Sequence, residues 1–338
     1  MARPSPNLRG ALLALLAFAI YAGHDVVVKL LGAHYPAVQI VFFATLLGFP
    51  LVTLMMIRDR SDGNLRPRHP GWTALRTGAL VISGLAAFYA FGVLPLAQTY
   101  AILFSMPLLI TLLSVPVLGE TVGLRRGLAV LVGLAGVLIV LRPGTAPLGL
   151  GHLAAVVAAL GSALSSVIMR KIGQHERNVV LLVYPMMANV VLMGIALPFV
   201  YVPVPVGHLA GFAAVALFAF LAMLVLIMAY RDGEAVIVAP MQYSQILWAA
   251  VYGYLIFGEA PDGATVLGAA VIIASGLYIL LRESRARVSE NRPVLTSRAR
   301  SGLAVFPRAR PFHRRPAGAG AEAAEGGNEP LANPAGNR

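Results

Sequence analysis

Long apolar runs alternate with short polar breaks along most of this chain. Ten such runs lie between residues 11 and 281. Each is about 20 residues long, the length at which a helix rising 1.5 Å per residue crosses a hydrocarbon core of roughly 30 Å. We therefore predict an all-α membrane protein with ten spanning helices, over residues 11–31, 37–57, 73–92, 96–118, 125–141, 149–169, 179–200, 208–230, 235–257 and 264–281.

The breaks and the interior prolines are compatible with this interpretation. The breaks are rich in Gly, Pro and charged residues, as in "RDRSDGNLRPRHPG" and "GEAPDG", which is typical of connecting segments. Pro107, Pro185 and Pro240 lie inside runs, and packed membrane helices tolerate such prolines. Arg3 and Arg9 precede the first run, as in a signal peptide. Nine further runs instead favour a first helix that is retained.

The composition argues against a soluble globular protein. The 338-residue chain is 58% hydrophobic and 12% charged, whereas soluble domains carry about 25% charged residues. It contains no cysteine, so it can form neither disulfides nor thiolate metal sites.

The C-terminal segment, residues 283–338, differs from the rest in composition. It is rich in Arg, Pro, Gly and Ala and has few large apolar residues. Such a segment cannot bury enough surface to offset its ordering entropy, so we predict a disordered tail. Its arginines can rest on anionic membrane lipid. It has no motif of a nucleic-acid-binding protein, and we expect no nucleic-acid partner.

Basic residues predict the orientation, because cytoplasmic loops hold the excess of Lys and Arg. One set of alternating connections holds nearly all of them, and the other set holds only Arg142, with Lys29 inside the end of a span. Both termini, including residues 1–10, are therefore predicted to be cytoplasmic. The basic set comprises Arg3, Arg9, Arg58, Arg60, Arg66, Arg68, Arg76, Arg125, Arg126, Arg170, Lys171, Arg177, Arg231 and the tail.

The two halves of the chain resemble each other. Gly119-Glu120 recurs as Gly258-Glu259 at an offset of 139, which also pairs Ser105 with Ser244. "AGVLIVLR" parallels "SGLYILLR" at an offset of 140, and "HDVVVKLLG" parallels "SSVIMRKIG" at 141. We predict two five-helix repeats, over residues 11–142 and 143–282. Because five is odd, the second must be inverted, a recurrent design of secondary transporters.

These motifs carry a family resemblance. The two "GE" ends, the "LRP" at residues 141–143 and the "PLAQT" at residues 95–99 resemble the drug/metabolite transporter superfamily and specifically its EamA family, over residues 11–282. The resemblance implies a ten-helix carrier of the bacterial inner membrane, often an exporter of metabolites or drugs, with a central cavity. "HDVVVKLLG" followed by "VFFATLLG" is similar to the subgroup of S-adenosylmethionine carriers. That subgroup commonly has Arg after the paired Phe, where this chain has Ala44.

Three ionisable residues in the first span are the leading site candidates. Asp25 is the only carboxylate well inside a predicted span, and buried charges in membranes usually face a cavity or a partner. Asp25 and Lys29 can alternatively form an ion pair four residues apart on one helix, and Lys29 can extend to the interface. His24 lines the cavity or faces a neighbouring helix as a neutral group. Their repeat counterparts, Ser165 and Ser166, carry no charge.

Further candidates lie in the third, fourth and ninth spans. The ninth holds "MQYSQILW", in which a helix would place amides and an aromatic ring on one face. These polar groups suit a planar polar solute, or else form hydrogen bonds between packed helices. Tyr100 can also anchor at the interface, and the serines of the sixth span are expected to serve close helix packing. The candidates are Tyr89, Tyr100, Ser105, Gln242, Tyr243, Gln245 and Trp248.

We predict a secondary transporter that moves a small polar metabolite or drug-like solute by alternating access. No cluster of acids and His at metal-ligand spacing and no "GxxxxGK" loop is present, so we expect no metal, no cofactor and no ATP-driven transport. A membrane enzyme and a non-transporting membrane subunit are the alternatives. Import and export, proton coupling, exchange and facilitation, and monomer and oligomer all stay open at this point.

Overall fold

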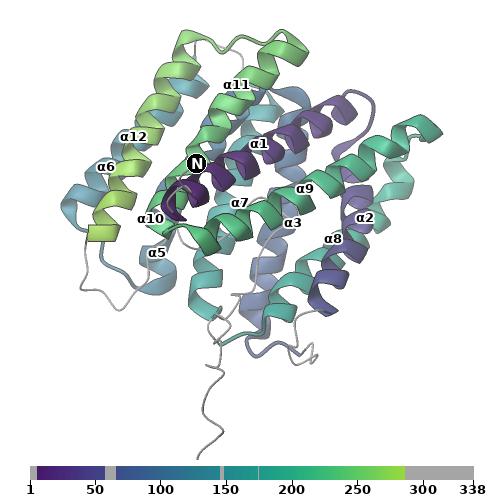
Figure 1. Ribbon diagram of the computed structural model, residues 1–338, viewed down its shortest axis with the longest axis horizontal. Coiled ribbons are helices and arrows are strands. Elements are labelled where there is room, and N and C mark those ends of the chain that lie inside the picture. Colours follow the sequence, from purple (N-terminus) through teal and green to yellow (C-terminus); the bar gives the residue numbers. More distant parts are fainter. Residues whose placement is uncertain (1–5, 58–65, 145–147, 174, 286–338) are drawn as a thin grey trace, which may run out of the picture. The chain divides into compact units, whose positions relative to one another are not determined.

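The computed structural model describes residues 6–57, 66–144, 148–173 and 175–285. Within these ranges the chain forms helices and connections and no β-strand (Figure 1). Nearly all of the predicted tail, and the first residues of the predicted cytoplasmic N-terminus, lie outside the described residues.

Every predicted span overlaps a helix or a broken helix. Seven helical stretches among the described residues are long and apolar enough to cross a membrane, so the chain is a multi-pass membrane protein. In the first half the helices are α1 (Pro6–Gly32), α2 (Ala37–Ile57), α3 (Pro70–Val93), α4 (Leu96–Leu103), α5 (Met106–Leu118) and α6 (Leu124–Leu141). The second half has α7 (Leu150–Ile172), α8 (Asn178–Val200), α9 (Val206–Asp232), α10 (Ala235–Val238), the 3-10 segment η1 (Ala239–Tyr243), α11 (Ser244–Phe257) and α12 (Gly263–Arg285).

The fourth and ninth predicted spans are both broken near their middle. The fourth is interrupted at residues 104–105, between α4 and α5, and the ninth at η1. Pro107 lies in the first turn of α5 and Pro240 in the first turn of η1. Because proline has no N–H, neither can donate the hydrogen bond that would continue the preceding helix. Broken helices at corresponding positions of two halves are typical of transporter binding sites.

The "GE" motif ends both broken spans in the same way. Gly119 follows α5 with φ 72°, and Gly258 follows α11 with φ 67°. This left-handed conformation favours glycine, which has no Cβ. The amide of the next residue then turns back to the helix, with Glu259 N donating to Gly253 O at 2.9 Å. Each motif thus stops a helix and places a carboxylate just beyond its end.

The main helix contacts join one half to the other. Helix α1 packs along α9, and α3 packs along α7. The first span of each half thus contacts the third span of the other half. Helices α6 and α12 also pack side by side (Figure 1). Their glycines permit close approach, since a Cβ added to Gly136 would lie 2.9 Å from the carbonyl oxygen of Gly268. The two halves therefore form one interlocked bundle.

Arg76 was counted among the basic residues of the connections in the predicted orientation, but it lies within a helix. Its side chain is fully buried within α3, where Nη1 donates to the carbonyl oxygen of Leu181 at 2.9 Å. The Nε and Nη2 atoms have no hydrogen-bond partner among the described residues. The charge of Arg76, counted for the predicted orientation, did not reveal this burial.

Candidate functional site

A chain of buried hydrogen bonds crosses the middle of the protein. Asp25 on α1 is 8% exposed, and its Oδ1 lies 2.7 Å from Nδ1 of His24. The hydroxyl of Tyr100, on α4, donates a short hydrogen bond to Oδ2 of Asp25. Gln245 on α11 donates through Nε2 to the Tyr100 oxygen at 2.8 Å. The chain of contacts thus starts in the first half and ends in the second.

The helix breaks place two of these residues. Tyr100 lies in the last turns of α4, just before the break that precedes α5. Gln245 is the second residue of α11, directly after η1. Both side chains are buried, so the two interrupted spans bring polar groups to the depth of Asp25.

A cavity borders this chain of hydrogen bonds. Residues from both halves line it. The ring centroids of Phe91 and Tyr100 are 5.3 Å apart, and those of Tyr100 and Phe104 5.8 Å apart. A carboxylate beside aromatic faces is suited to an organic cation or a planar polar ring. The lining residues are Asp25, Phe91, Tyr100, Leu103, Phe104, Met106, Ala159, Ser162, Gln242 and Gln245.

Two buried polar atoms of the hydrogen-bonded chain still have capacity to bind. Oε1 of Gln245 and Nε2 of His24 have no partner among the described residues. An unpaired buried polar group costs about 1–3 kcal/mol, which a solute or water can relieve. Within the described ranges no three Cys, His or acidic side chains form a metal-binding group. The chemistry available is one carboxylate, amides, a phenol, an imidazole and aromatic faces.

Four predicted site residues border the cavity and one touches it indirectly. Asp25, Tyr100, Gln242 and Gln245 are among its lining residues. His24 reaches the site through Asp25 and packs edge-on against Phe88, at a centroid distance of 5.8 Å.

The other predicted residues of the third, fourth and ninth spans lie elsewhere. Tyr89 is 38% exposed on α3, and Trp248 stacks on the ring of Tyr252. Tyr243 packs on Phe104 at a centroid distance of 5.3 Å. Ser105 is buried at the helix break, where its carbonyl oxygen accepts hydrogen bonds from the first amides of α5. None of these four is among the residues that line the cavity.

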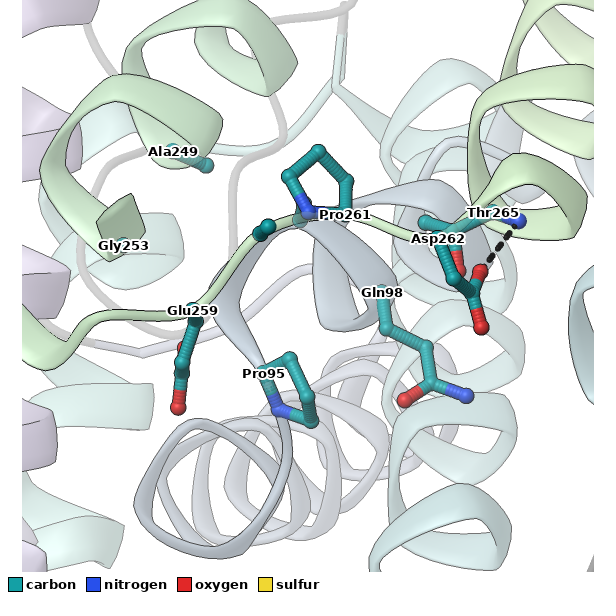
Figure 2. Close-up of a pocket in the computed structure, with 10 residues that line it drawn as sticks. Pro95, Gln98, Ala249, Gly253, Glu259, Pro261, Asp262 and Thr265 are labelled. Atoms are coloured by element: carbon teal, nitrogen blue, oxygen red, sulfur yellow. Dashed lines mark hydrogen bonds between the residues drawn. The ribbon is translucent and has the colours of Figure 1, made fainter.

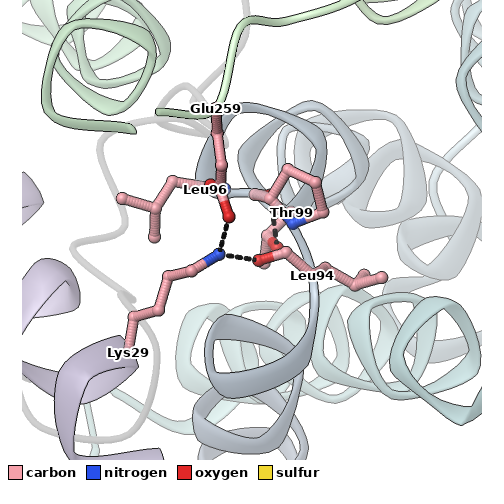
Figure 3. A network of polar contacts seen from close by, with 6 residues as sticks. Lys29, Leu94, Leu96, Thr99 and Glu259 are labelled. Atoms are coloured by element: carbon pink, nitrogen blue, oxygen red, sulfur yellow. Dashed lines mark hydrogen bonds and ion pairs between the residues drawn. The ribbon is translucent and has the colours of Figure 1, made fainter. Parts of the chain in front are cut away.

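Lys29 pairs with a distant acid rather than with Asp25. Its Nζ lies 2.5 Å from Oε1 of Glu259 and 2.6 Å from the carbonyl oxygen of Leu94 (Figure 3). The structure therefore has a contact between the two halves in place of the alternative pair along α1. Although Asp25 has the favourable four-residue spacing from Lys29 on α1, Lys29 pairs with a carboxylate 230 positions away in the sequence.

Glu259 also borders a second cavity. Pro95 and Gln98 of the first half and Gly253 and Asp262 of the second line the same space (Figure 2). This cavity and the central one share walls from α4 and α11. We refer to it as the outer pocket, because the predicted orientation places it on the outer side.

Asp262 lies beyond the helices, in the connection before α12. The Thr265 amide donates to its Oδ1 at 2.8 Å (Figure 2), and Arg142 pairs with its other oxygen. Hydrogen bonds from Thr265, helped by the Arg142 guanidinium, lower the pKa of Asp262. The carboxylate therefore stays ionised and ties the connection after α6 to the one before α12.

Glu120 and Glu259 served in the sequence only as repeat markers. The structure pairs each with a cation, Glu120 with Arg170 and Glu259 with Lys29, both at 2.5 Å. The recurrence of "GE" and the alignment of Lys29 with Arg170 were the signals that could have predicted these pairs.

Comparison with known proteins places the chain in a family. The sequence profile of the EamA-like transporter family matches it twice, over residues 8–142 and 149–281. A solved crystal structure matches with a TM-score of 0.54 at 22% identity, covering 85% of this chain and 100% of the other. At that identity the likeness concerns the fold alone.

Several relatives with a named activity match over most of their length. An S-adenosylmethionine uptake transporter of Rickettsia felis is 27% identical, over 80% of this chain and 92% of its own. A riboflavin transporter of Rhizobium johnstonii is 30% identical, over 83% and 94%. A pseudopaline exporter of Pseudomonas aeruginosa is 26% identical, over 79% and 94%.

The first of these relatives agrees with the subgroup resemblance seen in the first span. The names describe transport and not enzymatic turnover. With the double profile match and the apolar helices, they show that this chain belongs to the EamA-like transporter family and is a multi-pass membrane transporter rather than an enzyme.

Proposed function

We propose that this protein is a secondary transporter that carries a small polar metabolite across the bacterial inner membrane by alternating access. The observation that carries the proposal is the buried chain from Asp25 through Tyr100 to Gln245, which joins the two halves at the wall of a cavity. A carboxylate inside a membrane protein is costly unless it serves a pathway or a partner. Asp25 has both, because it accepts a hydrogen bond from Tyr100 and borders the cavity.

The proposed architecture is ten spans in two inverted five-helix repeats, with both termini cytoplasmic. Its support is that polar contacts between connections or span ends join segments predicted on the same side of the membrane. If the second repeat had the same orientation as the first, these contacts would join segments on opposite sides of the membrane. On the proposed outer side Arg142 meets Asp262 and Gln39 meets Val202, and on the proposed cytoplasmic side Arg9 meets Asp232 and Arg170 meets Glu120.

The site favours a solute with a positive charge next to a planar ring. Asp25 supplies the negative charge, Phe91, Tyr100 and Phe104 supply aromatic faces, and Gln245 an unpaired amide oxygen. S-adenosylmethionine, the solute named for the Rickettsia felis relative, has a sulfonium and an adenine ring. Riboflavin, named for the Rhizobium johnstonii relative, offers a planar ring without the charge. S-adenosylmethionine is accordingly the first solute to test and riboflavin the second.

The test is solute flux by the purified chain in proteoliposomes without ATP. Radiolabelled S-adenosylmethionine should enter in a saturable way, and Asp25→Asn should reduce the rate by about tenfold or more, because losing one member of a buried charged contact costs about 2–5 kcal/mol. Tyr89→Phe is the matched control, since this side chain lies outside the cavity lining, and it should transport like wild type. Equal flux by wild type and Asp25→Asn would contradict the proposed site.

Proton coupling through the His24 and Asp25 pair is part of the proposal. The pair lies at the cavity, where Tyr100 also contacts the carboxylate. A proton bound or released there changes the charge that meets the solute. An imposed pH gradient should therefore change the uptake rate of wild type and have no effect on residual uptake by Asp25→Asn. Wild-type uptake that ignores the gradient would favour exchange or facilitation.

A further inference from the structure

One ion pair occurs twice in this protein, with the two halves in exchanged roles. Lys29 of the first half meets Glu259 of the second, and Arg170 of the second half meets Glu120 of the first, each at 2.5 Å. The internal repeat aligns Lys29 with Arg170 and Glu120 with Glu259. Each half thus donates the cation to one pair and the carboxylate to the other.

Both pairs are largely withdrawn from solvent and reinforced by the backbone. The exposed fractions are 11% for the Lys29 side chain and 26% for Glu259, against 19% for Arg170 and 17% for Glu120. Lys29 also donates to the carbonyl oxygen of Leu94, and the second oxygen of Glu259 accepts from the amide of Leu96 at 3.3 Å (Figure 3). Pairs this buried are screened little by salt.

The second pair has the same kind of support. Arg170 holds both oxygens of Glu120, through Nη2 at 2.5 Å and Nη1 at 3.3 Å. The neighbouring Lys171 donates to the carbonyl oxygen of Val117 at 2.7 Å, near the end of α5. Removing one partner from either pair would leave a buried charge without compensation, which strongly disfavours the closed contact.

The two pairs lie beyond opposite ends of the central cavity. On α1, Lys29 is four residues, or about 6 Å, past Asp25. Glu259 in turn borders the outer pocket (Figure 2). On α7, Arg170 is eight residues, or about 12 Å, past the lining residue Ser162. Because the proposed topology runs α1 outward and α7 inward, the pairs flank the cavity along both paths to water.

We propose that these pairs are the two gates of the transport cycle, Lys29–Glu259 closing the outer path and Arg170–Glu120 the cytoplasmic path. The proposal rests on the proposed alternating-access function. In an inverted repeat the two ends are equivalent, so an exchange of conformations between the halves opens one end as it closes the other. Each pair joins the halves and must break when its end opens. Both pairs are formed in the structure.

The alternative is that the pairs only hold the halves together. In that case, loss of either pair loosens the whole bundle and exposes the cavity to both sides alike. Gates behave differently, because weakening one end shifts the population toward the state open at that end and away from the opposite state. The direction of the change in accessibility separates the two interpretations.

The experiment uses the absence of cysteine from the chain. Leu103→Cys places a single thiol at the cavity wall, at a position with no polar role. Its labelling by a membrane-impermeant maleimide is measured from the outside in right-side-out vesicles and from the cytoplasmic side in inside-out vesicles. The tests are Glu259→Gln and Glu120→Gln in this background. Glu234→Gln is the matched control, because it neutralises an exposed acid in the connection after α9.

Glu259→Gln should raise labelling from outside by about threefold or more and lower it from the cytoplasmic side, and Glu120→Gln should do the reverse. Glu234→Gln should leave both rates unchanged. The exchanged pair Lys29→Glu with Glu259→Lys should restore the rates toward wild type, since it restores the contact. If Glu259→Gln does not fold, Lys29→Gln tests the same gate.

Labelling that rises equally from both sides, or is unchanged in both variants, would contradict the proposal that the two pairs are gates. This failure is distinct from that of the proposed function. Flux by wild type with unshifted labelling refutes the gates alone. Shifted labelling without flux of any tested solute supports the proposed gates but contradicts the proposed solutes.

Discussion

The two halves of this transporter match at their ends and differ at their centre. At the ends, each half contributes the same basic position and the same "GE" motif, and these meet in two equivalent pairs. At the centre, the first half has His24 and Asp25 where the second has Ser165 and Ser166. The scaffold was thus kept in duplicate, while the charged chemistry belongs to one copy.

The serines form no counterpart of the polar chain. Ser166 donates to the carbonyl oxygen of Ser162 within its own helix at 2.8 Å, and the Ser165 hydroxyl has no partner among the described residues. Tyr100 aligns with Ala239 at the offset of the "GE" motif, so the second half has no phenol at this position either. It contributes Gln245 instead, which completes the contact to Tyr100.

The largest expected effect comes from making the halves alike. Giving the first half the serines of the second, by His24→Ser with Asp25→Ser, should reduce transport about 100-fold, because losing a buried charged contact costs about 2–5 kcal/mol. The double change Ser165→Ala with Ser166→Ala should leave transport within about twofold. Flux in proteoliposomes measures both, and comparable losses in the two variants would show that the halves contribute equally.

Removing one hydroxyl at the centre should have the next largest effect. Tyr100→Phe deletes the hydrogen bond to Asp25, and a hydrogen bond to a charged group contributes about 1.5–3 kcal/mol, so we expect solute affinity to fall about tenfold or more. Tyr243→Phe makes the same chemical change at the aligned break, where the hydroxyl has no described partner, and should change affinity little. Equal effects of the two variants in a binding titration would argue against the special role of Tyr100.

A smaller loss is expected from the contribution of the second half. Gln245→Met introduces the residue aligned with it in the first half, Met106, and removes the hydrogen bond to Tyr100. A neutral hydrogen bond contributes about 0.5–1.5 kcal/mol, so affinity should fall about two- to tenfold. The same titration measures it, and unchanged affinity would place the solute away from Gln245.

Substitutions where α6 packs on α12 should have the smallest effect on transport, because they act mainly on stability. A Cβ at Gly136 would lie 2.9 Å from the Gly268 carbonyl oxygen, whereas one at Gly127 on the same helix meets no atom within 4 Å. Gly136→Ala should therefore lower the melting temperature in detergent by several degrees, since overpacking costs about 1–3 kcal/mol. Gly127→Ala should not lower it, and equal melting temperatures would refute close packing of α6 on α12.

Much of the fold could be predicted because membrane crossing limits the chain to apolar helices of a fixed length. The helix positions followed from the apolar runs. The breaks in the fourth and ninth spans did not, because proline is tolerated within membrane helices and does not by itself show where one is interrupted. For the same reason the spacing of Gln242, Gln245 and Trp248 was judged on a continuous helix. In the structure Gln242 belongs to η1 and Trp248 packs on Tyr252.

The candidate site was predictable where a residue type was unusual for its surroundings. Asp25 was conspicuous as a carboxylate deep in an apolar run, and it borders the cavity. Its link to Tyr100 and the pairing of Lys29 with Glu259 depend on tertiary contacts between distant residues. Local spacing favoured a pair along α1, whereas the repeat itself contained the better clue to the partner of Lys29.

The most direct test of the central claim is whether solute protects the cavity wall only when Asp25 is present. A single thiol at Leu103→Cys is labelled in purified protein with and without saturating S-adenosylmethionine, or the solute that the flux assay identifies. We predict that solute slows labelling about tenfold in the protein with Asp25, and not in Asp25→Asn at the same concentration. Equal protection in both proteins would contradict a solute site built on Asp25.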